Sequence, residues 1–189
     1  MRVIGGKYRS RRLIAPAGVQ TRPTSDRLRE TLFNVLGAGV EESLWLDLFA
    51  GSGAIGIEAL SRGARMIYFV ESSNRATRAI RSNLASLKHS QGFEIIEREA
   101  VAALHLLEGR AVACDFCFLD PPYRHKGDYA KVLNFLSGST LLVPDSLVIA
   151  EHDKHFDPGE IFGELHRCRI LRQGDAVLSF YSFSAARRD

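Results

Sequence analysis

The apolar positions of this 189-residue chain fall into two alternating patterns. Short, nearly continuous apolar runs are typical of buried strands, whereas apolar residues three or four positions apart are typical of helices. The strand-like runs cover residues 44–49, 66–71, 93–98, 114–119 and 146–151. Helix-like spacing fills the intervals between them, as in residues 73–88, 100–107 and 129–136. This alternation predicts an α/β fold with a mostly parallel sheet and helices on both faces.

The beginning of the chain departs from this alternation. Residues 2–4 and 12–14 have the pattern of two short strands around a glycine pair, which predicts a small hairpin. An amphipathic helix is expected next, ending before Gly37, and Thr24 is its predicted N-cap. We therefore expect a hairpin and helix extension, residues 1–36, packed on a main domain of residues 37–189.

The end of the chain departs from it as well. Residues 165–171 and 176–183 have the pattern of two consecutive strands. Consecutive strands joined by a short turn pair antiparallel, so an antiparallel edge on the otherwise parallel sheet is predicted.

The first candidate site follows the strand of residues 44–49. Gly51 and Gly53 come directly after this strand and precede a helix, so backbone there can turn sharply or approach a ligand closely. Asp47 places a carboxylate near the end of a buried strand, where it needs a cationic or hydrogen-bonding partner. The methionine end of S-adenosylmethionine would suit this pair of features. Gly51–Gly56 also fits G-x-G-x-x-G with Glu71 twenty residues after Gly51, so a dinucleotide remains open at this point.

A second motif, Asp120-Pro121-Pro122-Tyr123, follows the strand of residues 114–119. Both prolines lack an N–H group, so this stiff backbone offers mainly carbonyl acceptors beside the Asp120 carboxylate. The exocyclic amine of a nucleobase can donate its two N–H groups to Asp120 and to the Pro121 carbonyl, and the base can stack on Tyr123. This favours methyl transfer to an amine and disfavours a nicotinamide enzyme.

Charge is concentrated at the beginning of the chain. Residues 1–30 carry eight basic and two acidic side chains, although the net charge of the whole chain is only +3. A basic segment on a mildly acidic body is typical of a protein that binds nucleic acid, and a solvated basic face without a partner is the alternative. The candidate contacts to RNA phosphates are Arg9, Arg11, Arg12, Arg22 and Arg27.

Other classes are disfavoured by composition. No apolar run approaches the roughly 20 residues of a membrane span, and the N-terminus lacks the apolar core of a signal peptide. Three cysteines argue against a disulfide framework and favour the cytoplasm. Cys114 and Cys117 lie in one predicted strand, where odd spacing is expected to direct them to opposite faces. We expect no metal site.

Several segments together resemble the bacterial 16S rRNA guanine(966)-N2 methyltransferase family, a group of class I S-adenosylmethionine-dependent enzymes. The resemblance rests on Arg2-Val3-Ile4-Gly5-Gly6, Pro16-x-Gly18, Thr21-Arg22-Pro23-Thr24-x-Asp26-Arg27-x-Arg29-Glu30-x-Leu32-Phe33-Asn34, Asp47-Leu48-Phe49-Ala50-Gly51-Ser52-Gly53, Asp120-Pro121-Pro122-Tyr123 and Gly174-Asp175. It covers essentially the whole chain and implies a Rossmann-like, seven-stranded sheet with one antiparallel edge strand.

The resemblance also implies roles for individual residues. The methionine end of the cofactor would be held by Asp47, Phe49, Gly51 and Gly53, and its ribose by Glu71. The adenine would lie against Ser72, Glu99 and Ala100. Thr24 and Arg27 would close over the site. Asp120, Pro121, Pro122 and Tyr123 would be the catalytic residues.

We therefore expect a cytoplasmic, monomeric enzyme that methylates N2 of a guanine in 16S rRNA within a small-subunit assembly particle. Two alternatives stay open. The same four-residue motif serves adenine N6 in DNA or RNA, and a non-catalytic RNA-binding assembly factor could keep the fold without the chemistry.

Overall fold

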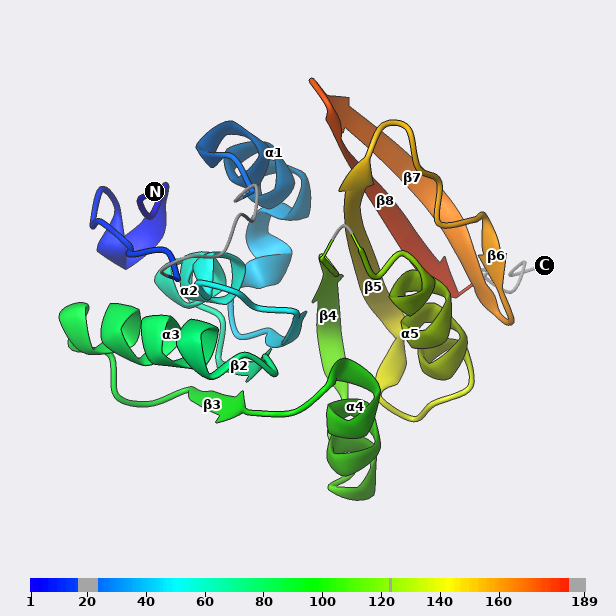
Figure 1. Cartoon of the computed structure of the whole chain (residues 1–189), viewed down its shortest axis with the longest axis horizontal. Coiled ribbons are helices and arrows are strands. Elements are labelled where there is room, and N and C mark those ends of the chain that lie inside the picture. Colours follow the sequence, from blue (N-terminus) through cyan, green and yellow to red (C-terminus); the bar gives the residue numbers. More distant parts are fainter. Residues whose placement is uncertain (17–23, 123, 184–189) are drawn as a thin grey trace.

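The computed structural model describes residues 1–16, 24–122 and 124–183 of the chain (Figure 1). The longer helices are α1 (Asp26–Leu36), α2 (Ala54–Ser61), α3 (Asn74–Ser86), α4 (Ala100–Gly109) and α5 (Gly127–Ser137), and two single turns of 3-10 helix are η1 (Gly6–Tyr8) and η2 (Gly37–Val40). The strands are β1 (Leu44–Leu48), β2 (Met66–Val70), β3 (Phe93–Ile96), β4 (Cys114–Leu119), β5 (Leu142–Asp153), β6 (Ile161–Phe162), β7 (Leu165–Gln173) and β8 (Ala176–Phe183).

The described strands form one sheet in the order β3-β2-β1-β4-β5-β8-β7-β6. The pairs from β3 to β5 are parallel, whereas β8 runs antiparallel to both β5 and β7. This confirms the predicted α/β class with an antiparallel region at one edge. The sheet has eight strands rather than seven because Ile161–Phe162 adds a two-residue strand beside β7.

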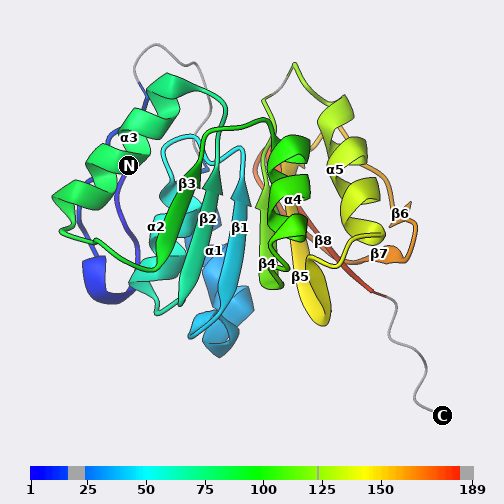
Figure 2. The same ribbon diagram turned by 90° about the horizontal axis from the view of Figure 1, so that it is seen from below.

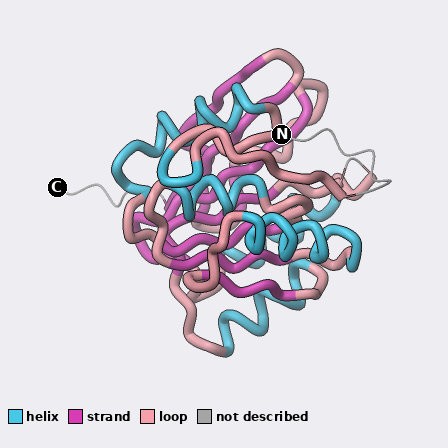
Figure 3. Tube along the Cα trace, turned by 90° about the vertical axis from the view of Figure 1, so that its left-hand side faces the viewer, coloured by secondary structure: helices cyan, strands magenta, loops and turns pink. Residues whose placement is uncertain are grey.

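Helices cover both faces of the sheet (Figures 1 and 2), and a separate hydrophobic core lies between the sheet and the helices on each face. One core joins α1, α2, α3 and the first residues of the chain to the sheet, and the other joins α4 and α5 to the opposite face. Neighbouring residues of β1 alternate between the two cores, since Trp45 belongs to the first and Leu46 to the second. Most of the sheet lies between helices, and the strands at one end of it reach the edge of the molecule (Figures 1 and 3).

The segment of residues 1–16, here called the N-terminal arm, forms the predicted hairpin only in part. Its two ends run antiparallel and are joined by one bridge between Arg2 and Arg12 and by backbone hydrogen bonds such as Val3 N–H to the Arg11 carbonyl at 2.9 Å, but no full strand forms and η1 lies between them. The reason is competition from side chains of α2. The backbone N–H groups of Ile4 and Gly5 donate to the Glu58 carboxylate at 2.7 and 2.8 Å, so they cannot extend a ladder.

The N-cap of α1 is Ser25 rather than the predicted Thr24. The Ser25 hydroxyl oxygen accepts the backbone N–H of Leu28 at 3.1 Å, which satisfies one of the free donors of the first turn. Thr24 instead donates its hydroxyl to Glu151 at 2.6 Å. The helix ends at Leu36 as predicted, and Gly37 follows it with a φ of 55°.

The expectation for Cys114 and Cys117 was wrong. Both thiols belong to the core beneath α4 and α5, because the β4–β5 register is irregular between Cys114 and Phe116. Burial raises the pKa of Cys114 to about 12 and the pKa of Cys117 well above its usual value. Both therefore remain protonated and unreactive near neutral pH, and all three cysteines are free thiols.

Candidate active site

Three carboxylates lie where β1, β4 and β5 reach the carboxyl edge of the sheet. Leu119 of β4 pairs with Leu48 of β1 and with Ala150 of β5, and all three of these residues face the core beneath α4 and α5. Side chains alternate along a strand, so the adjacent Asp47, Asp120 and Glu151 face the opposite side, toward α1 and α2. The carboxyl edge is where open α/β sheets bind their ligands.

Asp47 organises the turn between β1 and α2. Its side chain is 2% exposed, and its Oδ2 atom accepts the backbone N–H of Gly56 at 3.0 Å. Burial raises the pKa of Asp47 to about 8, the negative charge of Glu71 adds to this, and the hydrogen bond from Gly56 opposes it. The predicted hydrogen-bonding partner of this carboxylate is therefore a backbone group of the following helix.

The raised pKa of Asp47 gives a prediction for stability. The folded protein keeps a proton on Asp47 up to about pH 8, whereas the unfolded chain releases it near the ordinary value of 3.8. The free energy of unfolding should therefore fall as the pH rises between these two values, by at most about 1.4 kcal/mol per pH unit. Asp47→Asn keeps an oxygen for the Gly56 N–H and should make this fall less steep by the part that Asp47 contributes. Urea unfolding at a series of pH values measures it, and an equal slope in both proteins would contradict the assignment.

The turn after β1 has an unusual backbone. Phe49, Gly51 and Gly53 have φ values of 60°, 56° and 76°, in the left-handed region. Glu71, at the end of β2, fixes this turn from the next strand, because its Oε2 accepts the Gly51 N–H at 2.9 Å and its Oε1 accepts the Ser73 N–H at 2.8 Å. The spacing of Gly51 and Glu71 in the sequence thus corresponds to a direct contact.

The remaining candidates for adenine contacts lie farther along the same edge. Ser72 follows β2 and is exposed, and Glu99 follows β3, is exposed and does not cap α4 with its side chain. Ala100 is the buried first residue of α4. Ser72 follows the strand next to β1, whereas Glu99 and Ala100 follow β3, two strands from β1, so the three residues share the carboxyl edge with the turn after β1.

The second motif begins at the end of β4. Asp120 is partly accessible and Pro121 is buried, whereas Pro122 is exposed and its carbonyl accepts the His125 N–H at 2.7 Å. Burial raises the pKa of Asp120 well above its usual value, and the negative charges of Glu151 and Asp47 raise it further. Tyr123 and Arg22, both predicted site residues, lie outside the described residues.

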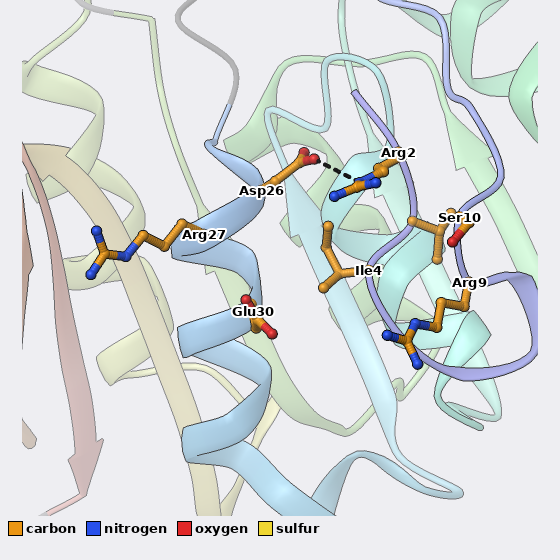
Figure 4. A pocket seen from close by; sticks show the side chains of 8 residues that line it. Arg2, Ile4, Arg9, Ser10, Asp26, Arg27 and Glu30 are labelled. Atoms are coloured by element: carbon orange, nitrogen blue, oxygen red, sulfur yellow. Dashed lines mark ion pairs between the residues drawn. The ribbon is translucent and has the colours of Figure 1, made fainter.

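A groove of about 350 Å³ separates the N-terminal arm from α1 (Figure 4). Its lining residues are Arg2, Val3, Ile4, Arg9, Ser10, Asp26, Arg27 and Glu30. Arg9 of the arm and Arg27 of α1 are exposed here, and Arg2 pairs with Asp26 at 3.4 Å. Arg11 and Arg12 are exposed elsewhere on the arm. Four of the five arginines predicted to contact RNA are therefore accessible in the described part of the chain.

Arg29 belongs to the same basic segment of the sequence, but unlike these four arginines it is not accessible. It is fully buried and donates to Asp26 Oδ1 at 2.8 Å and to the Arg2 carbonyl at 2.5 Å. It therefore ties the arm to α1 and is not available to a phosphate.

The residues that hold the arm in place were not identified from the sequence. Glu58 is fully buried in α2, where it binds the arm backbone and pairs with Arg62 at 2.8 Å. Asn83 of α3 binds both backbone groups of Ile14 and also donates to the Ser52 carbonyl at 2.9 Å. The sequence did contain a signal for both residues. Each is a polar side chain among the apolar residues of its helix, and a buried polar side chain requires a hydrogen-bonding partner.

The part of the chain that the structure describes contains no helix that is long and apolar enough to cross a membrane. Among the same residues, no three or more His, Cys, Asp or Glu side chains are grouped so that they could hold a metal ion.

Comparison with known proteins gives consistent matches over most of the chain. "Putative rRNA methyltransferase YlbH" of Bacillus subtilis is 39% identical over 96% of this chain and 98% of its own length. "Ribosomal RNA small subunit methyltransferase D" of Escherichia coli is 35% identical over 81% of this chain and 75% of its own length. The solved structure "Putative methyltransferase yhhF from Escherichia coli" superposes with a TM-score of 0.83 at 30% identity, covering 98% of both chains. The model of the family described as conserved hypothetical protein 95 matches residues 1–182, and the chain belongs to this family, together with the small-subunit rRNA methyltransferases D.

Proposed function

We propose that the protein transfers a methyl group from S-adenosylmethionine to the exocyclic N2 amine of a guanine in 16S rRNA. The observation that carries this proposal is the position of Asp120 and Pro121. They follow β4 at the carboxyl edge, beside the glycine turn that follows the neighbouring strand β1. Methyl donor and amine would thus meet across two adjacent strands, in a chain whose relatives are named as rRNA methyltransferases.

The turn after β1 fits the cofactor in three respects. An added Cβ at Gly51 would meet only the Phe49 carbonyl oxygen, at 3.9 Å, so the backbone there is open to a close approach, and the positive N-terminal end of α2 would face the methionine carboxylate. An added Cβ at Gly53 would lie 3.2 Å from Ile80 and Phe69, so this glycine permits close packing of the turn on the core. Glu71 already binds two backbone N–H groups, but each carboxylate oxygen has a second lone pair with which to accept a ribose hydroxyl. Asp47 and Phe49 would line the methionine end, and Ser72, Glu99 and Ala100 the adenine. When bound, S-adenosylmethionine supplies the methyl group on a positively charged sulfur.

The residues of the second motif would position the amine. In the ionised state, the Asp120 carboxylate accepts one N–H of the amine and the Pro121 carbonyl accepts the other. This holds the nitrogen closer to tetrahedral geometry and directs its lone pair toward the methyl carbon, so most of the catalysis is proximity and alignment. Asp120 then takes the proton that the amine releases. Pro122 stiffens the loop, and Tyr123 would stack on the base.

The N-terminal arm and α1 would bind the RNA around the target base. Arg9 and Arg27 flank the groove, with Arg11 and Arg12 on the arm beyond it. Arg22 and Thr24 belong to the segment before α1, and the Thr24 contact to Glu151 brings the end of this segment against β5. We propose that a monomer acts in the cytoplasm on a partly assembled small subunit. The target base must be extruded from its stack before its amine can reach Asp120.

Removing the charges of the arm should weaken RNA binding and reduce its dependence on salt. A variant with Arg9→Gln, Arg11→Gln and Arg12→Gln should lower the slope of log affinity against log salt concentration by about 2–3, since each lost phosphate contact removes nearly one unit. Filter binding at several salt concentrations measures the slope. Arg110→Gln with Lys131→Gln removes two exposed charges at the end of α4 and on α5, on the other face of the sheet, and should leave the slope unchanged. An unchanged slope in the arm variant would place RNA elsewhere.

The decisive experiment for the proposed function is methyl transfer from labelled S-adenosylmethionine to small-subunit particles that lack the modification, followed by nucleoside analysis. The proposal requires label in N2-methylguanosine. Label in N6-methyladenosine would keep the cofactor and overturn the substrate. Cofactor binding without any label in the RNA would favour the non-catalytic assembly factor.

A further inference from the structure

Glu151 lies beside Asp120 but has no part in the steps described above. Leu119 and Ala150 pair in register in the parallel strands β4 and β5, so the residues that follow them, Asp120 and Glu151, are neighbours. Both side chains face the α1 side of the sheet, and the charge of Glu151 contributes to the raised pKa of Asp120. A second carboxylate therefore stands next to the proposed amine acceptor.

This second carboxylate is held in a fixed position. The Glu151 side chain is 8% exposed, and its Oε2 atom accepts the Thr24 hydroxyl at 2.6 Å. The backbone carbonyl of Glu151 accepts the Tyr129 hydroxyl, so the residue is held at both ends. The buried guanidinium of Arg29 interacts with its charge. A carboxylate oriented in this way costs little further ordering when it binds a donor.

The chemistry of guanine fits two adjacent carboxylates. Guanine presents N1–H and the N2 amine side by side on one edge, and both are donors. Adenine has an unprotonated N1 acceptor beside its N6 amine, so a carboxylate facing N1 would repel it. A single carboxylate can hold the amine of either base. A second carboxylate beside it distinguishes the two bases, because it would face N1 of adenine, and two acceptors without a proton between them are strongly disfavoured in a buried site.

We propose that Glu151 accepts the N1–H of the target guanine and thereby selects guanine over adenine, while Asp120 accepts the N2 amine. The inference rests on the proposed function and adds the residue that determines its base specificity. Glu151 takes no proton in this role, and it acts by binding the edge of the base next to the reacting amine.

The test uses base analogues at the methylated position. Small-subunit particles are reconstituted from 16S rRNA in which a synthetic segment carries guanine, 2-aminopurine or 6-thioguanine at the position that the wild-type protein methylates. 2-Aminopurine keeps the N2 amine but has an acceptor at N1, and 6-thioguanine keeps both N1–H and the amine. Wild-type kcat/KM should fall about 10- to 100-fold or more with 2-aminopurine, the loss expected for a hydrogen bond to a charged group. It should remain close to the guanine value with 6-thioguanine.

The variant Glu151→Gln should reverse the preference. Its amide oxygen can still accept from Thr24, and its NH₂ group can donate to N1 of 2-aminopurine but opposes N1–H of guanine. We expect kcat/KM to fall about 10- to 100-fold on guanine and to rise on 2-aminopurine relative to the wild type. Glu164→Gln is the matched control, since Glu164 is exposed between β6 and β7, and it should behave as the wild type on all three bases.

Two results would overturn the inference. One is equal wild-type activity on guanine and 2-aminopurine, a comparison that does not depend on any variant being folded. The other is an equal loss by Glu151→Gln on both bases, which would make Glu151 a structural residue. Failure of the proposed function is distinct from both, because the wild-type protein would then leave the guanine particles without N2-methylguanosine.

Discussion

Replacing Asp120 with alanine should reduce methyl transfer by on the order of 100-fold or more and leave cofactor affinity little changed. The side chain follows β4, whereas the residues proposed to hold the methionine end and the ribose lie at the ends of β1 and β2 or directly after them. Its loss removes one of two acceptors for the amine and the group that takes the proton. The measurement combines single-turnover transfer to small-subunit particles with calorimetric titration of the cofactor.

Two variants support the interpretation of this experiment. Asp120→Asn keeps one acceptor oxygen but cannot take a proton, so its rate should lie between those of the wild type and Asp120→Ala. Asp145→Asn changes an exposed aspartate near the amino end of the sheet and should retain full activity. If Asp120→Ala transferred methyl groups at the wild-type rate, the amine would have to be held by other residues.

Replacing Glu58 with alanine should lower the free energy of unfolding by about 3–5 kcal/mol, the range for removing one partner of a buried ion pair. The Glu58 carboxylate accepts the N–H groups of Ile4 and Gly5 and pairs with Arg62. Without it, three donors at the contact between arm and α2 lose their acceptor. Urea unfolding measures the loss, and limited proteolysis should show faster cleavage within residues 1–16.

Glu164→Ala serves as the control for this prediction, because Glu164 is exposed at the turn between β6 and β7. It should change stability by less than about 0.5 kcal/mol, as surface substitutions usually do. Normal stability together with a protected arm in Glu58→Ala would mean that the apolar contacts of Val3, Tyr8 and Leu13 suffice to hold the arm.

Sequence patterns predicted the centre of the sheet because strands such as β1 and β4 are largely buried on both faces and therefore have nearly continuous apolar runs. The range Cys114–Leu119 was predicted to the residue. The two-residue strand Ile161–Phe162 was missed because so short a segment has no periodicity, and the irregular register after Cys114 was missed because a bulge depends on the partner strand.

The positions of Gly51, Gly53 and Asp120 directly after strands were predictable, because each motif has a local backbone signature. Contacts between distant segments were not predictable in this way. Thr24 was expected to cap α1, but its hydroxyl binds Glu151, which is 127 residues away in the chain. Glu58 was part of a helical stretch, and the sequence alone does not show that two backbone N–H groups from residues 4 and 5 require its carboxylate.

The attachment of the N-terminal arm also determines when this part of the protein can fold during synthesis. Its anchors lie far downstream, since Ile4 binds a residue 54 positions later and Ile14 binds a residue 69 positions later. Such long-range contacts form slowly, because the intervening chain must first be brought together. On the translating ribosome, the arm leaves the exit tunnel well before α2 and α3, so its arginines remain unattached and exposed to the surrounding RNA until α3 has emerged.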